Sequence, residues 1–153
     1  MFGKVIEFLA DRFFDRDRER PRVAISLKPG EARAEPDPEA PALSVRVTWN
    51  LKLALANEAQ TPAADLKLVW PQEPLFHAAL PYYLGTFEEK AVPIRVQKTL
   101  PREQAFGSLP PELAEASFVL AYRDLRGGYF HTRYTRRGEQ ESSEFREKLP
   151  EVT

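Results

Sequence analysis

The segment from Leu43 to Ala56, LSVRVTWNLKLALA, most constrains the fold, because apolar and polar side chains alternate along it. A period of two is typical of a β-strand that buries one face and exposes the other. The alternation from Leu43 to Leu55 spans thirteen residues, which exceeds the usual length of a strand, so we expect a bulge or bend near the middle. The expected buried face consists of Leu43, Val45, Val47, Trp49, Leu51, Leu53 and Leu55.

The same alternation recurs in shorter segments on both sides of this strand. Residues 22–28, 64–70 and 91–100 each predict a further strand. Within the last of them, Pro93 cannot donate a ladder hydrogen bond. We therefore expect that strand to lie at a sheet edge or to contain a bulge.

The clearest hairpin lies near the end of the chain. Residues 117–124 and 129–135 alternate in character on either side of the turn sequence LRGG. Asp124 can begin the turn, and Gly127 can adopt the positive φ that closes a bulged hairpin. About seven short strands joined by such turns predict an all-β fold, an antiparallel sandwich.

Residues 1–20 predict an amphipathic helix, because their apolar side chains recur at helical spacing and Pro21 ends the pattern. Acidic residues interrupt the apolar run, so we expect neither a secretory signal nor a membrane span, and a cytoplasmic location. The apolar stripe can dock on its own domain, mediate self-association or bind a separate protein, whereas its mixed charge disfavours a membrane surface. The expected partner-binding residues are Phe2, Val5, Ile6, Leu9 and Phe13.

The end of the chain is acidic and poor in apolar side chains. Residues 138–153 contain five acids and two bases, which predicts an acidic flexible tail or one short docked helix. The expected organisation is an amphipathic helix over residues 1–20, a β-sandwich domain over residues 22–137 and the tail over residues 138–153.

Composition argues against several classes of chemistry. The chain has no cysteine, which excludes disulfides, thiolate nucleophiles and cysteine metal sites. Its two histidines, His77 and His131, lack the partners that catalysis requires, and we expect His131 on an exposed strand face. We therefore predict no enzyme, no catalytic residues, no metal and no cofactor. Arginine outnumbers lysine 15 to 7, a pattern of thermophilic bacteria and also of high genomic GC content.

Prolines and acids between the first two strand segments predict a solvated loop over residues 29–41. Its carboxylates offer oxygen ligands for Ca²⁺, but the extended proline geometry and the absence of calcium-loop spacing favour the solvated loop. The carboxylates are those of Glu31, Glu35, Asp37 and Glu39.

An aromatic cluster lies among prolines in the middle of the chain, at Trp70, Phe76, Tyr82 and Tyr83. Large aromatic side chains usually serve packing, so we expect them to close one end of the core. The alternative is a stacking platform for a sugar or a groove for a proline-rich peptide.

The last hairpin has the strongest local charge asymmetry, since its bases interleave with aromatics. Such a β surface can bind phosphates while stacking on bases, which makes single-stranded nucleic acid, or another polyanion, an alternative partner. The whole chain has 22 bases and 23 acids, a net charge of −1, which favours instead a solvated hairpin neutralised by the acidic tail. The candidate polyanion-binding residues are Arg123, Arg126, Arg133, Tyr134, Arg136 and Arg137.

Four motifs between residues 42 and 135 give the chain a family resemblance. It resembles bacterial immunoglobulin-like and fibronectin-III-like sandwich domains, particularly the cell-adhesion-related domain found in bacteria. Ala59 stands where that family usually has glycine, and Phe87 replaces its leucine. The motifs are a strand ending in asparagine at Leu53–Asn57, an alanine-rich start of a strand at Pro62–Leu66, the segment Leu84–Phe87 and the hairpin Tyr122–Gly127.

The resemblance implies an antiparallel immunoglobulin-like sandwich that serves as a binding or spacer module, without catalytic residues to carry over. Together with the residue patterns, it predicts a non-catalytic protein-interaction or assembly module. The alternative function is a polyanion-binding module that uses the hairpin of residues 122–137.

Overall fold

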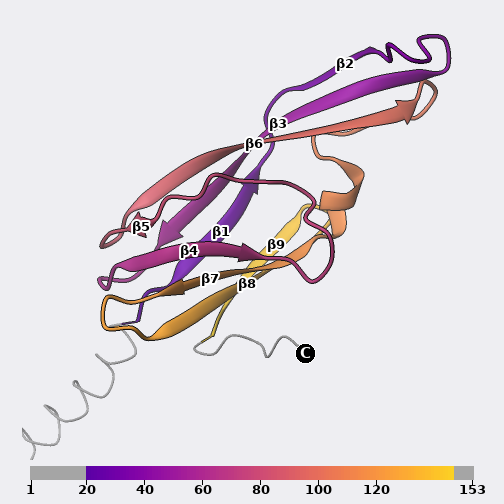
Figure 1. The fold of residues 1–153 in the computed structure, drawn as a ribbon. Helices are drawn as coiled ribbons and strands as arrows, with labels where there is room; N and C mark the ends of the chain where they lie inside the picture. The colour runs from indigo at the N-terminus through magenta and orange to yellow at the C-terminus, as the bar shows by residue number, and fades with distance from the viewer. Residues whose placement is uncertain (1–19, 147–153) are drawn as a thin grey trace, which may run out of the picture.

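In the computed structural model, which describes residues 20–146, the chain forms two antiparallel β-sheets (Figure 1). The prediction of an all-β fold is therefore confirmed, with more strands than the sequence pattern indicates. No helix within the described range is long and apolar enough to cross a membrane. The elements are β1 (Val23–Lys28), β2 (Ala32–Pro36), β3 (Ser44–Asn57), β4 (Ala63–Val69), β5 (Tyr83–Leu84), β6 (Glu89–Pro101), the 3₁₀ helix η1 (Pro111–Glu115), β7 (Ser117–Arg123), β8 (Tyr129–Arg137) and β9 (Gln140–Arg146).

The predicted N-terminal helix lies outside the described residues, so its role as a partner-binding element stays a prediction. The same holds for the last seven residues of the predicted tail, 147–153. The residues of the helix concerned are Phe2, Val5, Ile6, Leu9 and Phe13.

β3 is the central strand of the first sheet. β6 pairs with β3 along one side, and β1 and β2 pair with it one after the other along the opposite side. The second sheet has the strand order β5-β4-β7-β8-β9. Because β6 has a strand partner on one side only among residues 20–146, Pro93 lies on a sheet edge, as predicted.

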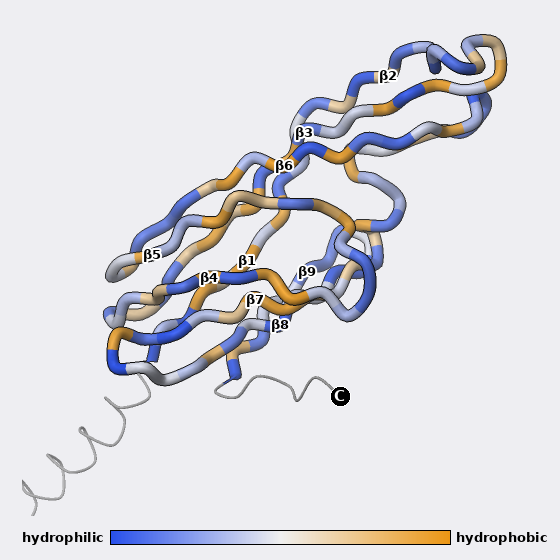
Figure 2. Tube along the Cα trace, in the orientation of Figure 1, coloured by the Kyte–Doolittle hydropathy of each residue, from blue (hydrophilic) through white to orange (hydrophobic). Residues whose placement is uncertain are grey.

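The apolar faces of the two sheets share one core. Figure 2 shows apolar and polar residues alternating along β3 and β6, and most of the apolar residues in these strands are buried. Leu43 departs from the prediction, because it precedes β3 and is 75% exposed. The largest fully buried side chains include Trp49, Leu51, Leu53 and Leu55 from β3 and Phe118, Leu120 and Tyr134 from the second sheet.

The bulge expected in the long strand is not in β3. β3 pairs with β6 from Ser44 to Ala56 without a shift in register. The irregularity lies in the segment that pairs with β3 on its other side. There, the three residues 29–31 between β1 and β2 face only the two residues 50–51 of β3. One extra residue is thereby inserted in the edge, and the N–H of Asn50 donates to the carbonyl of Glu31 at 2.9 Å.

Two segments expected to be irregular are strands. Ala32–Pro36, within the predicted solvated loop, forms β2 because the long β3 offers it a partner. Gln140–Arg146, within the predicted flexible tail, forms β9 along β8. The residues that β9 turns toward the first sheet include Glu141 and Ser143, so its alternation carries no hydrophobic signal.

β2 and the adjoining halves of β3 and β6 extend beyond the second sheet, and we name this extension the arm (Figure 1). A loop that follows β6 packs back against it. The indole Nε1 of Trp49 donates to the carbonyl of Gly107 at 3.0 Å, and the ring of Phe106 meets the indole edge-on. The arm is therefore anchored to the core at its base.

Replacement of Gly30 by alanine should destabilise the fold, because a Cβ at this position would overlap the carbonyl oxygen of Asn50. We expect Gly30→Ala to lower the free energy of unfolding by about 2 kcal/mol or more, measured by urea denaturation. Gly107→Ala is the matched control, since a Cβ there meets nothing within 4 Å. Equal stabilities of the two variants would contradict the assignment of the bulge.

Candidate functional site

Three turns and the start of β1 come together at one end of the two sheets, which we name the loop end (Figure 1). The turns join β3 to β4, β5 to β6 and β7 to β8. They comprise residues 58–62, 85–88 and 124–128. This end of the molecule carries exposed apolar side chains and a cavity.

Asn57, the last residue of β3, joins three segments of the loop end through its buried side-chain amide. Its Oδ1 accepts hydrogen bonds from the N–H groups of Arg22 and Ala59, at 3.3 and 3.2 Å. Its Nδ2 donates to the carbonyl oxygens of Thr61 and Gly85, at 2.9 and 3.0 Å. One amide thus ties the start of β1 to two of the turns, which fixes their relative positions.

The turn between β5 and β6 presents a phenyl ring to solvent. Phe87 has a φ of +52°, which residues other than glycine rarely adopt, and its side chain is 62% exposed. Its N–H donates to the carbonyl of Ala59 at 3.1 Å. The carboxylate of Glu88 accepts a hydrogen bond from the N–H of Gly85, which lowers the pKa of Glu88 below its usual value. The turn is therefore held by hydrogen bonds on both sides of the ring.

The turn between β7 and β8 has the predicted bulged form, with Gly127 at a φ of +91°. Oδ1 of Asp124 accepts hydrogen bonds from the N–H groups of Arg126 and Gly128, at 3.0 and 2.7 Å. The side chains at its rim are exposed: Leu125 to 62% and Tyr129 to 64%.

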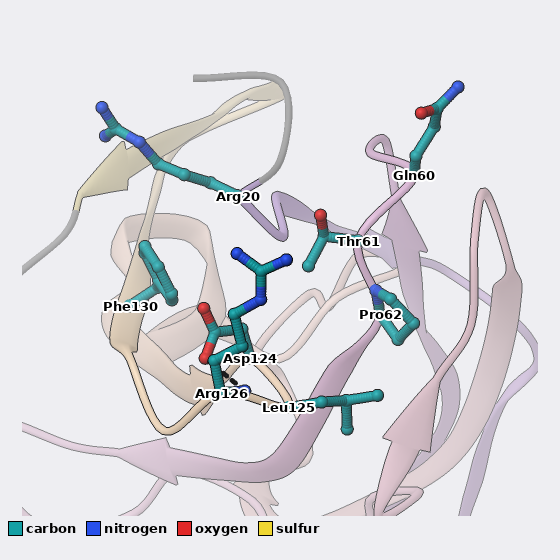
Figure 3. Close-up of a pocket in the computed structure, with 8 residues that line it drawn as sticks. All are labelled: Arg20, Gln60, Thr61, Pro62, Asp124, Leu125, Arg126 and Phe130. Carbon is teal, nitrogen blue, oxygen red and sulfur yellow. Dashed lines mark hydrogen bonds between the residues drawn. The ribbon is translucent and has the colours of Figure 1, made fainter. Parts of the chain in front are cut away.

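A cavity of about 370 Å³ lies between this turn and the turn that joins β3 to β4. Pro62, Leu125 and Phe130 give it apolar walls, and Thr61 and Arg126 supply polar groups. Figure 3 shows the guanidinium of Arg126 in the space between Thr61 and Phe130. The remaining lining residues are Arg20, Gln60 and Asp124.

The six residues predicted to bind a polyanion do not form one surface. Tyr134 and Arg136 are buried between the sheets, so the prediction is wrong for these two. Arg133 and Arg137 alternate with them on β8 and lie exposed on the outer face of the second sheet. Nη2 of Arg123 donates to the hydroxyl of Tyr82 at 2.8 Å. The sixth, Arg126, lines the cavity.

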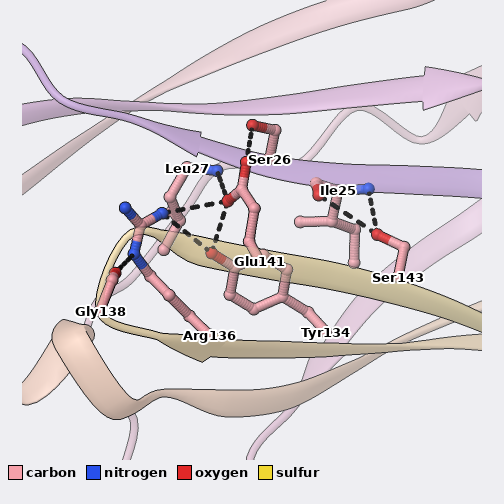
Figure 4. Close-up of polar contacts among 8 residues, drawn as sticks. All are labelled: Ile25, Ser26, Leu27, Tyr134, Arg136, Gly138, Glu141 and Ser143. Carbon is pink, nitrogen blue, oxygen red and sulfur yellow. Dashed lines mark hydrogen bonds and ion pairs between the residues drawn. The ribbon is translucent and has the colours of Figure 1, made fainter.

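Side chains of the second sheet hydrogen-bond to the edge of β1 that faces away from β3, and we name this contact the polar seam (Figure 4). The N–H of Val23 donates to the hydroxyl of Tyr122 at 3.2 Å. The N–H of Ile25 donates to Oγ of Ser143 at 3.0 Å, and the N–H of Leu27 donates to the carboxylate of Glu141 at 3.1 Å. Side chains thus take the place of a neighbouring strand.

Glu141 is the centre of the polar seam and explains the burial of two predicted site residues. Its carboxylate accepts hydrogen bonds from the hydroxyl of Tyr134 at 2.7 Å and from Nη1 of Arg136 at 3.1 Å, and also from the hydroxyl of Ser26. Burial by itself would raise the pKa of Glu141. The hydrogen bonds from Ser26, Tyr134 and the N–H of Leu27, with the charge of Arg136, hold that pKa below its usual value.

The two histidines lie in different environments. His131 is only 2% exposed, which corrects the prediction of an exposed strand face. Burial lowers the pKa of His131, and the positive charges of Arg146 and Arg133 lower it further. His77 lies on the exposed segment that precedes β5. Within residues 20–146, no group of three or more histidine, aspartate and glutamate side chains is placed to hold a metal ion.

The predicted acidic loop uses two of its carboxylates locally. Glu31 pairs with Arg33 at 3.3 Å, and Asp37 accepts a hydrogen bond from the N–H of Glu39 at 3.1 Å. Glu35 lies in β2, opposite Arg46.

The aromatic cluster divides into a packed pair and an exposed pair. The rings of Trp70 and Phe76 lie 4.7 and 5.7 Å from that of Phe118, which confirms core packing for these two. Tyr82 and Tyr83 are exposed, so the prediction of core closure is wrong for them.

Comparisons of the chain with protein-family models, with curated proteins and with solved structures find no match. The function of the chain has to be inferred from its geometry.

Glu141→Gln should destabilise the protein by about 2 kcal/mol at neutral pH, because it leaves the buried guanidinium of Arg136 without its carboxylate. Since the pKa of Glu141 is lowered in the folded state, its contribution is present above its unfolded pKa and is lost as the pH falls through the folded value. The difference in unfolding free energy between the native protein and the variant should therefore shrink from about pH 6 to about pH 3, measured by denaturation at each pH.

Glu139→Gln is the matched control, because Glu139 is exposed on the turn that precedes β9. It should change stability by less than about 0.5 kcal/mol at every pH. A pH-independent effect of Glu141→Gln would argue against the ionised carboxylate as the centre of the seam.

Proposed function

We propose that the chain is a non-catalytic protein-interaction module that binds its partner through the loop end, on an immunoglobulin-like arrangement of two sheets. The observation that carries the proposal is the set of exposed apolar side chains on hydrogen-bonded turns: Phe87, Leu125 and Tyr129, each more than 60% exposed. Large apolar side chains that gather on one surface are typical of interaction sites. The cytoplasmic location expected from the sequence is part of the proposal.

The rigidity of the turns favours binding over incidental exposure. Asn57 and Asp124 fix the backbones of the turns in the folded protein. Ordering a loop on association costs free energy, and turns that are already ordered avoid most of that cost. The positive φ of Phe87 adds to the argument, because strained backbone positions cluster at functional sites.

The motifs of the family resemblance support the same surface. Asn57 ends the first motif, and Pro62 opens the second at the β3–β4 turn. The motif Leu84–Phe87 forms the β5–β6 turn, and Tyr122–Gly127 enters the β7–β8 turn. Motifs that are spread along the sequence thus meet at the loop end, as expected of a shared binding architecture.

The test compares a loop-end variant with a control at the opposite end. Proteins are captured on the native chain from a lysate of its source cells and quantified. The double variant Phe87→Asn with Leu125→Asn should no longer capture them, although its thermal unfolding midpoint should equal that of the native chain. Asparagine tolerates the positive φ at position 87. Leu43→Ser, at an exposed site on the arm, should retain them.

Each captured protein is then purified and titrated calorimetrically against the same three chains, and self-association is measured by sedimentation. Partners that bind the loop-end variant as tightly as the native chain would overturn the proposal.

A second candidate function, polyanion binding, is favoured by the outer face of the second sheet. Arg133 and Arg137 lie on this face with three bases from neighbouring strands, Lys67, Arg123 and Arg146. Three of the five have acidic neighbours, because Lys67 pairs with Asp65 at 3.7 Å, Arg146 pairs with Glu144, and Arg133 lies opposite the same Glu144. The remaining positive charge matches the phosphates of a single strand, with Tyr129 available for stacking.

For this candidate, fluorescence anisotropy with a labelled single-stranded oligonucleotide should show binding that weakens steeply between about 50 and 200 mM salt, because neutralised phosphates release counterions. Arg133→Ser with Arg137→Ser should abolish it. Arg33→Ser with Arg95→Ser, on the first sheet, is the control. Absence of salt-sensitive binding would leave the protein-interaction proposal alone.

A further inference from the structure

Arg126 provides a guanidinium without a partner in the loop-end cavity. Within residues 20–146 no carboxylate lies within ion-pair distance of it. The neighbouring Asp124 is engaged elsewhere, because its Oδ1 accepts two backbone hydrogen bonds of the turn. The turn therefore holds the backbone of Arg126 in place while its side chain extends into the cavity (Figure 3).

Arg126 is exposed at the mouth of the cavity, where an unpaired guanidinium attracts an anion and binds carboxylates with two parallel hydrogen bonds. Asp124 also lines the cavity, and its negative charge disfavours a doubly charged ligand more than a singly charged one. A singly charged carboxylate therefore fits better than a doubly charged phosphate. Thr61 lies on the opposite wall of the cavity.

The residues of the cavity walls and rim indicate which kind of molecule the bound carboxylate belongs to. Pro62, Leu125 and Phe130 line the cavity with apolar surface, which suits an apolar group adjacent to the acid. Leu125 lines the cavity and is also 62% exposed, so it continues the apolar surface onto the rim. A protein surface is therefore the occupant that uses both the cavity and its rim.

We infer that the cavity binds the carboxylate of an acidic residue of a protein partner, with an apolar residue beside it packed against Leu125 and Phe130. This inference rests on the proposed function and names the chemistry of the partner. Arg126 would bind the partner's carboxylate, and the exposed apolar side chains of the loop end would surround this ion pair.

The test uses nuclear magnetic resonance titration of the full chain with two blocked tetrapeptides, Gly-Glu-Phe-Gly and Gly-Gln-Phe-Gly. The glutamate peptide should shift the amide resonances of Thr61, Arg126 and Gly127, and the glutamine peptide should bind about tenfold more weakly or not at all. Arg126→Gln should weaken binding of the glutamate peptide by a similar factor. Arg95→Gln, at an exposed position on β6, should leave it unchanged.

Equal binding of the two peptides, or equal binding by the native chain and Arg126→Gln, would overturn the inference. A free carboxylate, 3-phenylpropionate, forms a third arm. If it binds while the glutamate peptide does not, the cavity is a small-molecule site and the inference is wrong.

Capture of partners separates this inference from the proposed function. If Arg126→Gln retains partners that the variant at Phe87 and Leu125 loses, the proposed function stands and the carboxylate anchor fails. If neither variant loses partners, the proposed function itself fails.

Discussion

β3 pairs with β6 at thirteen consecutive positions, and that register positions every other part of the first sheet. A slip of one residue would turn the buried row of Trp49 and Leu51 toward solvent and bring Asn50 and Lys52 into the core. The same register fixes where β3 ends, which places the amide of Asn57 within reach of three segments at the loop end. Because neither long strand absorbs an extra residue, the bulge falls on the other edge, where only glycine fits beside Asn50.

The exposed backbone groups at the sheet edges are satisfied or removed in different ways. The edge of β1 is closed by hydroxyl and carboxylate side chains, which bond the same N–H groups that a neighbouring strand would bond. Such a closure differs from a backbone ladder because it depends on the ionisation of Glu141. Within the part of the chain that the structure describes, β6 keeps a free edge, but Pro93 and Pro101 remove donors from it, and β2 is short. These are devices that discourage pairing between molecules.

Alternation of side chains predicts the strands that bury apolar residues, and it fails where the buried row is polar. Hydrophobic patterning does not detect β9, because two of its inward residues, Glu141 and Ser143, are polar and accept hydrogen bonds from the edge of β1. In β8 the period of two places Tyr134 and Arg136 on the buried face and Arg133 and Arg137 on the exposed face. In the sequence all four belong to one run of basic and aromatic residues. Their division requires knowledge of which face of β8 meets the core. The role of Asn57 depends on contacts 28 and 35 residues away along the chain, which no local pattern contains.

At the loop end, the side chains that stabilise the turns differ from the side chains that are exposed to solvent. Asn57 and Asp124 hold the turns through hydrogen bonds to the backbone, while Phe87, Leu125 and Arg126 contribute no side-chain bond to that framework within the described residues. The exposed side chains are therefore free to vary without loss of the fold, and the geometry in which they are presented stays constant. A surface built in this way separates recognition from stability. Under the proposed function, that separation would let one scaffold bind different partners by changes at a few exposed positions, because loops on a rigid scaffold tolerate substitution.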